Sequence, residues 1–321
     1  MILILSEERD QSTNIIIDWL NYFKRPFIRV NETDICIIKK IGLTTDEVII
    51  TIAGDELNFD GISAYWYRRG NFNIALPNDI TKENLPFKDE IKKNLKEELA
   101  ILVDYLHLIL RNKKHVGCFF DNYTNKLQNL TLAKKCGLQV PNTIISSKKD
   151  LIVDFLNKEK EIITKAISET ILFSNQNNGA IQAYTSIVKK DEISQYNESL
   201  FPSLFQNKID KKYELRIFYL AGEFFPMAIF SQSNNKTKTD FRKYDRETPN
   251  RCVPYSLPET IKTKLDSFMK LKRLSTGSID MVVDSRNEYI FLEVNPVGQF
   301  GMTSYPCNYY LEKKIAEYLC N

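Results

Sequence analysis

The segment at residues 277–296, GSIDMVVDSRNEYIFLEVNP, restricts the possible folds of this chain more than any other stretch. Apolar and polar residues alternate on both sides of its polar centre, a pattern that predicts two antiparallel strands joined by a short turn. With Arg286 and Asn287 as a two-residue loop, the apolar residues of the two strands face one another on one side of the hairpin. The predicted pairs are Ile279 with Val294, Met281 with Leu292, and Val283 with Ile290. A one-residue slip would mix apolar and charged groups on both faces, so the pattern favours this register.

The other face of the hairpin places two carboxylates opposite each other. The same register pairs Asp280 with Glu293, and Asn295 shares their face because side chains alternate along a strand. Opposed carboxylates repel unless a cation lies between them, and two carboxylates with an amide offer oxygen ligands suited to Mg²⁺. Because Mg²⁺ keeps open positions for phosphate oxygens, the cluster indicates a bound nucleotide. The alternative is that Asp280 and Glu293 are solvated groups with Lys or Arg neighbours.

Length and patterning predict a mixed α/β chain in three compact units. The 321 residues are too many for one small core, and the order of elements divides them at residues 1–120, 121–204 and 205–321. Strands are expected at residues 2–5, 27–30, 36–39, 48–52, 62–69, 143–145, 161–167, 213–220 and 223–230, beside the hairpin. Helices are expected at residues 13–23, 89–111, 125–136, 149–156, 258–274 and 309–319. The helix at 89–111 carries a stripe of leucines, which are Leu95, Leu99, Leu102, Leu106 and Leu110. The polar stretch at 168–180 is expected to be a mobile loop.

Charge and cysteine usage exclude several classes of protein. The 44 basic and 41 acidic side chains leave a net charge of +3, which argues against a dedicated nucleic-acid binder. The first residues, MILILSEERD, lack the basic and long apolar regions of a signal peptide, and no apolar run approaches the roughly 20 residues that span a bilayer. The six scattered cysteines form no CxxC pair, so reduced structural thiols in a cytoplasmic protein are expected.

Four further polar residues are candidates for a phosphate site, and each has a structural alternative. Lys165 lies in the otherwise apolar strand EIITKAI, where it either binds phosphate or reaches solvent from the strand end. Glu214 and Arg216 share a strand face in KYELRIFYL, as part of a site or as a cross-strand ion pair. Arg242 follows a polar loop, where a surface arginine is the usual alternative. No Walker loop or GxGxxG turn occurs, and His107 is expected to be a structural residue of the long helix.

Taken in order, these residues resemble the ATP-grasp superfamily. The set comprises Lys165, Glu214 and Arg216, Asp240 and Arg242, Asp280, and the Glu293–Asn295 strand end with its following proline. The segment NKLQNLTLAKKCGLQVPNTIIS, residues 125–146, is similar to the opening of the ATP-grasp central domain. Within the superfamily, EVNPVGQFGMTSYPCNYYLEKKIA at 293–316 and AYWYRRG at 64–70 are similar to the graspetide (microviridin-type) maturases of "grasp-with-spasm" systems.

This resemblance implies a fold, a reaction and a set of ligands. The fold would be the α+β ATP-grasp fold, with an N-terminal α/β lobe and two α+β lobes that clamp ATP between them. The reaction would be phosphorylation of an Asp or Glu side chain of a ribosomal peptide, followed by attack of a Ser or Thr hydroxyl or a Lys amine. Asp280, Glu293 and Asn295 would hold Mg²⁺, and Arg216 and Arg242 would stabilise the transferred phosphate and the oxyanion. ATP would also contact Lys165, Phe205, Gln206, Ile209 and Glu214, with the 168–180 loop as a lid.

The resemblance also implies partners. The substrate would be a precursor peptide with a leader, which docks on the central domain, and a core that contains Thr, Glu and Asp. Arg68 and Arg69 would orient the acidic core, or else form a basic surface patch. A homodimer is expected, and neither nucleic acid nor membrane is expected as a partner. Two other functions stay open: a RimK-like ligase that joins an amino acid or amine to a carboxylate, and a catalytically idle nucleotide-binding scaffold.

Overall fold

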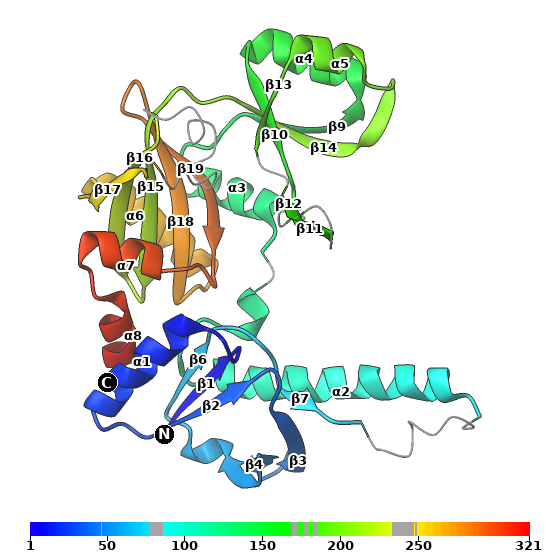
Figure 1. Cartoon of the computed structure of the whole chain (residues 1–321), viewed down its shortest axis with the longest axis vertical. Helices are drawn as coiled ribbons and strands as arrows, with labels where there is room; N and C mark the ends of the chain where they lie inside the picture. The colour runs from blue at the N-terminus through cyan, green and yellow to red at the C-terminus, as the bar shows by residue number, and fades with distance from the viewer. Residues whose placement is uncertain are drawn as a thin grey trace.

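A computed structural model describes the chain except at residues 46, 77–85, 123, 169–171, 176–178, 183–184, 233–246 and 248, and except for the side chains of 172–175 and 179–182. Figure 1 shows the central sheet at one end of the molecule, the N-terminal sheets at the other end, and the C-terminal sheet between them. None of the helices described is long and apolar enough to cross a bilayer.

The N-terminal region contains a parallel sheet whose strand order is β2-β1-β6-β8. Its strands are β1 (Ile2–Ser6), β2 (Phe27–Asn31), β6 (Ala64–Tyr67) and β8 (Lys114–Val116). Every residue of β1 is buried, as expected for a strand with both sheet faces covered. Ile2 and Ile4 face α1 (Gln11–Tyr22), whereas Leu3 and Leu5 face α2 (Lys88–Arg111) and a second sheet. That second sheet, of order β5-β4-β3-β7, comprises β3 (Ile35–Gly42), β4 (Glu47–Ile52), β5 (Asp55–Asn58) and β7 (Asn73–Ile74).

Helix α2 packs on the sheet through its C-terminal half only. Val103, Leu106 and Leu110 are buried there, while the N-terminal half extends beyond the sheet (Figure 1). The predicted stripe of leucines is therefore buried at one end, and Leu102 is 37% exposed.

The central sheet is antiparallel and has its own hydrophobic core. Its order is β13-β10-β14-β9, with strands β9 (Thr143–Lys148), β10 (Ile162–Lys165), β13 (Ser186–Val188) and β14 (Ser199–Asn207). Helices α4 (Lys149–Glu159) and α5 (Lys190–Ser194) contribute to this core together with Ile162, Val188 and Phe205. Because β14 pairs with β9 and β10, the boundary placed after residue 204 falls inside this strand. The chain enters and leaves the unit at adjacent residues: the Asn207 N–H donates to the Asn142 carbonyl at 3.1 Å, and the Asn142 N–H donates to Asn207 Oδ1 at 2.8 Å.

The expectation of a loop across residues 168–180 is wrong in part. Strands β11 (Leu172–Asn175) and β12 (Gly179–Gln182) pair there as a two-stranded antiparallel hairpin. The segment carries few apolar residues in any periodic order, and that is why its sequence favoured a loop.

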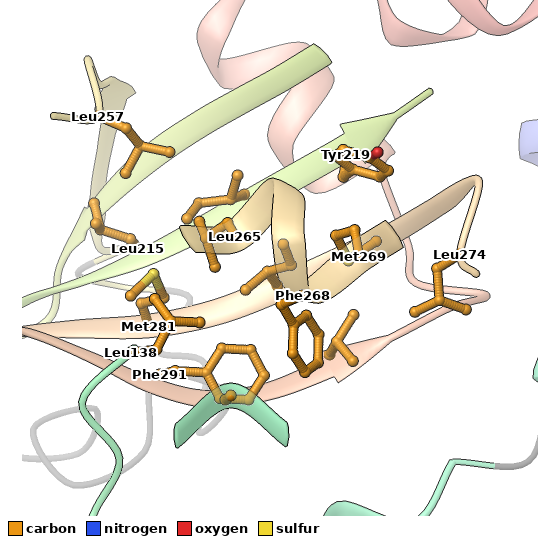
Figure 2. Packing of buried hydrophobic residues seen from close by; sticks show 14 of the residues in the cluster. Leu138, Leu215, Tyr219, Leu257, Leu265, Phe268, Met269, Leu274, Met281 and Phe291 are labelled. Atoms are coloured by element: carbon orange, nitrogen blue, oxygen red, sulfur yellow. The ribbon is translucent and has the colours of Figure 1, made fainter. Parts of the chain in front are cut away.

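The C-terminal sheet is antiparallel, with strand order β17-β16-β15-β18-β19. Its strands are β15 (Lys211–Leu220), β16 (Glu223–Phe230), β17 (Arg251–Pro254), β18 (Thr276–Asp284) and β19 (Tyr289–Asn295). Helix α6 (Glu259–Leu271) covers one face: Leu265, Phe268 and Met269 pack on the strands near Met281 and Phe291 (Figure 2). Helix α3 (Lys126–Lys135), which precedes the central sheet in sequence, packs on this same core through Leu130 and Ala133.

Two last helices join the C-terminal region to the N-terminal sheet. They are α7 (Gly301–Cys307) and α8 (Leu311–Cys320). Leu311 and Ile315 of α8 share one buried cluster with Ile16 of α1 and with Phe218 of β15. The N-terminal parallel sheet and the C-terminal sheet are therefore held by a common core, which contains no residue of the central sheet.

The β18–β19 hairpin has the predicted register at its open end and a different one near its turn. Ile279 pairs with Val294 and Asp280 pairs with Glu293, as the alternation predicted. Nearer the turn, Met281 pairs with Phe291 and Val283 with Tyr289, so the predicted partners Leu292 and Ile290 are wrong.

Two local features produce this change of register. The loop is longer than the predicted pair of residues, because the Asp284 N–H donates to the Glu288 carbonyl at 3.1 Å across Ser285, Arg286 and Asn287. Asn287 takes a left-handed conformation with φ of 64°, which closes such a loop. A β-bulge at Leu292 then restores the predicted register. Because of the bulge, Phe291 and Val294 both face the core although they are three residues apart.

Candidate nucleotide and metal site

A cavity of about 420 Å³ lies between the central sheet and the C-terminal sheet. Its charged lining includes Lys126, Glu161, Lys165, Lys208, Asp210, Lys211, Glu214, Asp280 and Glu293. Its apolar lining includes Pro141, Ile163, Ile187, Ile209, Leu215, Met281, Val282 and Leu292. A cavity of this size, with apolar walls and a few convergent charged groups, is typical of a small-molecule site.

The structure brings most of the predicted nucleotide and metal residues to this cavity. Lys165, Gln206, Ile209, Glu214, Asp280 and Glu293 all line it. Phe205 does not, because alternation along β14 turns it into the core of the central sheet while Gln206 faces the cavity. Asn295 is exposed at the end of β19 and is not among the lining residues. Arg242 and Asp240 lie outside the described residues.

The two opposed carboxylates each have a cationic neighbour. Arg216 Nη1 donates to both oxygens of Asp280 at 3.1 Å, from the directly paired position on β15. Lys126 Nζ lies 3.6 Å from Glu293 Oε2 and donates to the Ser168 carbonyl at 2.8 Å. In the described part of the chain, no group of three or more His, Cys, Asp and Glu side chains is placed to hold a metal. A cation at this site would therefore be held by two carboxylates, with amide or phosphate oxygens completing its coordination.

Lys126 lines the cavity beside Glu293, and no pattern in the sequence predicted this position. It is the first residue of α3, and the side chain of Asn125 caps the helix by accepting from the Leu127 and Gln128 N–H groups at 3.0 and 3.1 Å. This cap fixes the helix start, and with it the direction in which Lys126 reaches toward Glu293. Lys126 and Glu293 come together only because α3 packs on β19, so the periodicity of the sequence could not predict this contact.

Glu214 and Arg216 share a strand face as predicted, and each has its own partner. Glu214 is 4% exposed, and its carboxylate accepts from Lys211 Nζ and from Ser231 Oγ. Arg216 pairs with Asp280 on the neighbouring strand, so the cross-strand ion pair that the sequence left open is present. On the central sheet, Gln206 lines the cavity but is only 1% exposed, and its Nε2 donates to Thr143 Oγ1 at 2.9 Å.

A second cavity, of about 390 Å³, lies where the N-terminal sheet meets the loop after β19. Its walls include Arg69, Glu7 and Arg9 on one side and Gln299 and Tyr305 on the other. Arg69 is partly exposed, with Nη1 3.8 Å from Glu7 Oε1. It lies at the carboxyl ends of β1 and β6, where the order of a parallel sheet reverses, a common position for ligand sites.

Arg68 differs from its neighbour because its guanidinium is buried. The side chain is 5% exposed, Nε lies 2.9 Å from Asp10 Oδ2, and Nη1 donates to the Val297 carbonyl at 2.8 Å. Burial lowers the pKa of Arg68 from its ordinary value, and the Asp10 carboxylate opposes that shift. Arg68 also lines the second cavity, so its contact with the substrate stays a prediction, although two of its nitrogens already lie against Asp10 and Val297.

No protein-family model matches the chain. Among curated proteins, it is similar to the alpha-aminoadipate–LysW ligases LysX of Sulfurisphaera tokodaii and Sulfolobus acidocaldarius, with 26% and 25% identity over 215 residues. These matches cover 61% of this chain, and 68% and 70% of the two relatives.

Solved structures match over the whole chain. The macrocyclase MdnC of Microcystis aeruginosa, bound to its precursor peptide MdnA, has a TM-score of 0.76 and 26% identity, covering 100% of this chain and 99% of that one. A RiPP-associated ATP-grasp ligase of Chryseobacterium gregarium, in complex with ADP and a leader and core peptide, has a TM-score of 0.82 and 22% identity, covering 99% and 96%. The chain has the ATP-grasp fold, and over its whole length it resembles the graspetide-type peptide maturases.

Proposed function

We propose that this protein is an ATP-dependent ligase that closes ester or amide rings in a ribosomally made peptide. The observation that carries the proposal is the opposed pair Asp280 and Glu293, which pair with Arg216 and Lys126 respectively and line the same cavity between the two sheets as Lys165. The fold and the full-length likeness to MdnC support a peptide as the substrate.

The cavity residues fit ATP and Mg²⁺. Apolar side chains such as Ile163, Ile187 and Met281 suit an adenine ring, and the lysines suit phosphates. Asp280 and Glu293 would hold Mg²⁺, with Asn295 as a further oxygen donor from the end of β19. Bound Mg²⁺ would neutralise phosphate charge at this point.

The remaining residues account for the two halves of the reaction. In the first half, the γ-phosphoryl group of ATP passes to a carboxylate of the peptide, giving an acyl phosphate and ADP. In the second half, a hydroxyl or amine of the same peptide attacks the acyl carbon, loses its proton, and releases inorganic phosphate. Lys126 and Lys165 would bind the phosphates, while Arg216 and Arg242 would face the negative charge that develops during both transfers.

For the acidic side chain of the peptide, we assign the second cavity. Arg69 and Arg9 supply positive charge there, and the cavity borders the loop that follows Glu293 and Asn295. Arg69 would orient a carboxylate of the peptide through an ion pair. Its present partner Glu7, at 3.8 Å, is distant enough for the peptide to displace it.

The likeness to LysX favours one alternative, a ligase that joins a separate amine substrate to a carboxylate. Both reactions use the same phosphate and metal residues, so the product distinguishes them. A catalytically idle scaffold would bind ATP without releasing phosphate.

Mass spectrometry of a treated precursor peptide tests the proposal. The probe is a short peptide rich in Thr, Glu and Asp, chosen from the open reading frames that neighbour this gene and incubated with enzyme, ATP and Mg²⁺. Its mass should fall by one water per ring, and mild base should return each water if the bonds are esters. A gain equal to an added amino acid would establish the alternative ligase, and an unchanged peptide without phosphate release would reject the proposal.

A further inference from the structure

Arg68 connects the N-terminal sheet to the loop that follows β19, the strand that carries two of the proposed metal residues. It follows directly after β6, and its guanidinium is held between the α1 cap and the β19–α7 connection. The Nη1 group donates to the Val297 carbonyl at 2.8 Å, and the guanidinium carbon lies 5.7 Å from the centre of the Phe300 ring. With an exposed fraction of 4%, the whole residue is enclosed by these contacts.

The other side of the arginine is fixed by Asp10. One oxygen of this carboxylate accepts from the Thr13 N–H at 3.0 Å, which caps α1, and the other lies 2.9 Å from Arg68 Nε. Asp10 is thus held by a helix end in the N-terminal sheet layer, and Arg68 is held by Asp10. The arginine therefore presents Nη1 to Val297 from a rigid support.

The contact at Val297 leads directly to the proposed metal site. The N–H of Val297 donates to Asn295 Oδ1 at 3.2 Å, while the carbonyl of the same residue accepts from Arg68. Backbone pairing with β18 holds β19 as far as Asn295, which lies opposite Ser278, and the pairing ends there. The Asn295 side chain is exposed, and its orientation depends on the 296–300 loop because its Oδ1 accepts from the Val297 N–H.

From this arrangement we infer that Arg68 is a positioning residue for the Asn295 side chain at the end of β19, which it holds through Val297 in the orientation that a divalent cation requires. The inference rests on the proposed metal role of Asp280, Glu293 and Asn295. Arg68 does not itself bind the metal in this role, although it also lines the second cavity. It acts through Val297, in the way that residues behind metal ligands commonly set the orientation of those ligands.

Arginine suits this position better than lysine. A guanidinium has donors in a fixed planar fork, so one group faces Asp10 while another meets the Val297 carbonyl. A lysine ammonium is a single point on a flexible chain and would satisfy one of these partners at a time. Charge alone is therefore insufficient, and Arg68→Lys is an informative variant.

Calorimetry of ADP binding at varied Mg²⁺ concentration tests the inference without relying on turnover. Arg68→Met and Arg68→Lys should each weaken the apparent Mg²⁺ affinity about tenfold or more, with metal-free ADP affinity changed less than about threefold. Lys114→Met is the matched control. Lys114 also joins the N-terminal sheet to the C-terminal region, since its Nζ lies 4.3 Å from the Tyr318 ring centre, but it does not contact the 293–297 segment. Its Mg²⁺ affinity should stay within about twofold of wild type.

Asp10→Asn keeps the test decisive if the Arg68 variants do not fold. Asparagine caps a helix as well as aspartate does, so α1 should persist while Arg68 loses its charged support, and Mg²⁺ affinity should again fall. Wild-type Mg²⁺ affinity in the folded variants would overturn the inference, as would an equal loss in Lys114→Met. Glu293→Gln separates this from failure of the proposed site: if that variant retains the Mg²⁺ response, the metal assignment itself is wrong.

Discussion

Arg216 and Asp280 face each other across neighbouring strands, and both charges are largely shielded from water. Arg216 is proposed to meet charge that appears during phosphoryl transfer, and an interaction made mainly in the transition state affects rate more than ground-state affinity. Arg216→Ala should therefore slow ring formation by about 10²–10³-fold, while ADP affinity changes much less.

Single-turnover cyclisation beside calorimetric ADP affinity measures both quantities. Asp280 also loses its partner in Arg216→Ala, so Arg216→Lys, which keeps a positive charge near Asp280, is the control for that loss. A collapse of nucleotide affinity with a near-normal rate at saturating ATP would show that Arg216 is a ground-state phosphate clamp instead.

Glu293 carries the central charge of the proposed metal cluster. Glu293→Gln keeps the size of the side chain and removes one formal charge, so most turnover should be lost while the melting temperature stays close to wild type. Lys126 provides a structural reason for the small effect on stability, because it retains its hydrogen bond to the Ser168 carbonyl when its contact with Glu293 weakens. Activity within about threefold of wild type would contradict the site assignment.

His107 makes the stability of the protein depend on pH. It is fully buried, stacks on Phe119 with ring centres 4.0 Å apart, and its Nε2 lies 2.9 Å from Asn71 Oδ1. Burial lowers the pKa of His107 from 6.5 to about 3. Between about pH 3 and pH 6.5, His107 binds a proton in the unfolded chain but not in the folded chain. The free energy of unfolding is therefore highest above about pH 6.5 and decreases as the pH falls below that value.

Replacing His107 with a residue that does not titrate should remove this pH dependence of the free energy of unfolding. The stability of wild type relative to His107→Gln should fall by about 2 kcal/mol between pH 6.5 and pH 5, because each pH unit in this window costs about 1.4 kcal/mol. Denaturant unfolding of both proteins at the two pH values measures the difference, and parallel curves would contradict the assignment of a neutral buried histidine.

At the scale of elements, the β-bulge in β19 predicts that one residue of the strand can be deleted without loss of the fold. Leu292 is the unpaired extra residue, since Phe291 pairs with Met281 and Glu293 with Asp280. Deletion of Leu292 would leave a regular strand with the same pairs, so the variant should fold and melt cooperatively. Its nucleotide affinity should fall, because Leu292 lines the cavity.

Deletion of Phe291 is the matched control for this change. That deletion removes a fully buried ring and should abolish cooperative folding. Circular dichroism and thermal melting of the two variants provide the comparison. If both deletions are equally destabilising, the bulge is required by the packing of β19 and is not a local irregularity.

The sequence predicted the pairing at the open end of the β18–β19 hairpin but not the pairing near its turn, and the reasons are physical. Alternation placed Asp280 opposite Glu293, because a wrong register would have buried charge. It could not reveal the bulge, because Phe291 and Leu292 are both apolar and either one fits a core position. The contacts of Lys126 and Arg68 could not be predicted for a related reason: each residue meets a partner far away in sequence, Glu293 and Val297 respectively.

At the scale of the whole molecule, the central sheet should unfold separately from a second body that comprises the N-terminal and C-terminal sheets. The N-terminal parallel sheet and the C-terminal sheet share the core that contains Ile16, Phe218 and Ile315, whereas the central sheet packs around Phe155 and Phe205. Scanning calorimetry of the ligand-free protein should show two transitions. Mg-ADP, which contacts both walls of the cavity in the proposed complex, should raise the transition of the central sheet and bring the two together.

Assignment of the transitions needs one variant in each body. Phe155→Ala should lower only the central-sheet transition, and Ile315→Ala only the other, each by several degrees. A single transition that both variants lower equally would show that the interface between the sheets is strong enough to make the chain one cooperative unit.

The paired hydrogen bonds between Asn142 and Asn207 give the central sheet the topology of an insertion. Its chain begins and ends at one point, and its core contains no residue of the other sheets. Domains with adjacent ends and separate cores can be moved between proteins, because few contacts cross the junction. The gene segment for residues 142–207 is therefore a natural unit of exchange. A chimaera that takes this segment from a related maturase would keep the proposed phosphate-transfer residues Arg216, Asp280 and Glu293 of the host. The side of the nucleotide cavity that the central sheet forms would come from the donor.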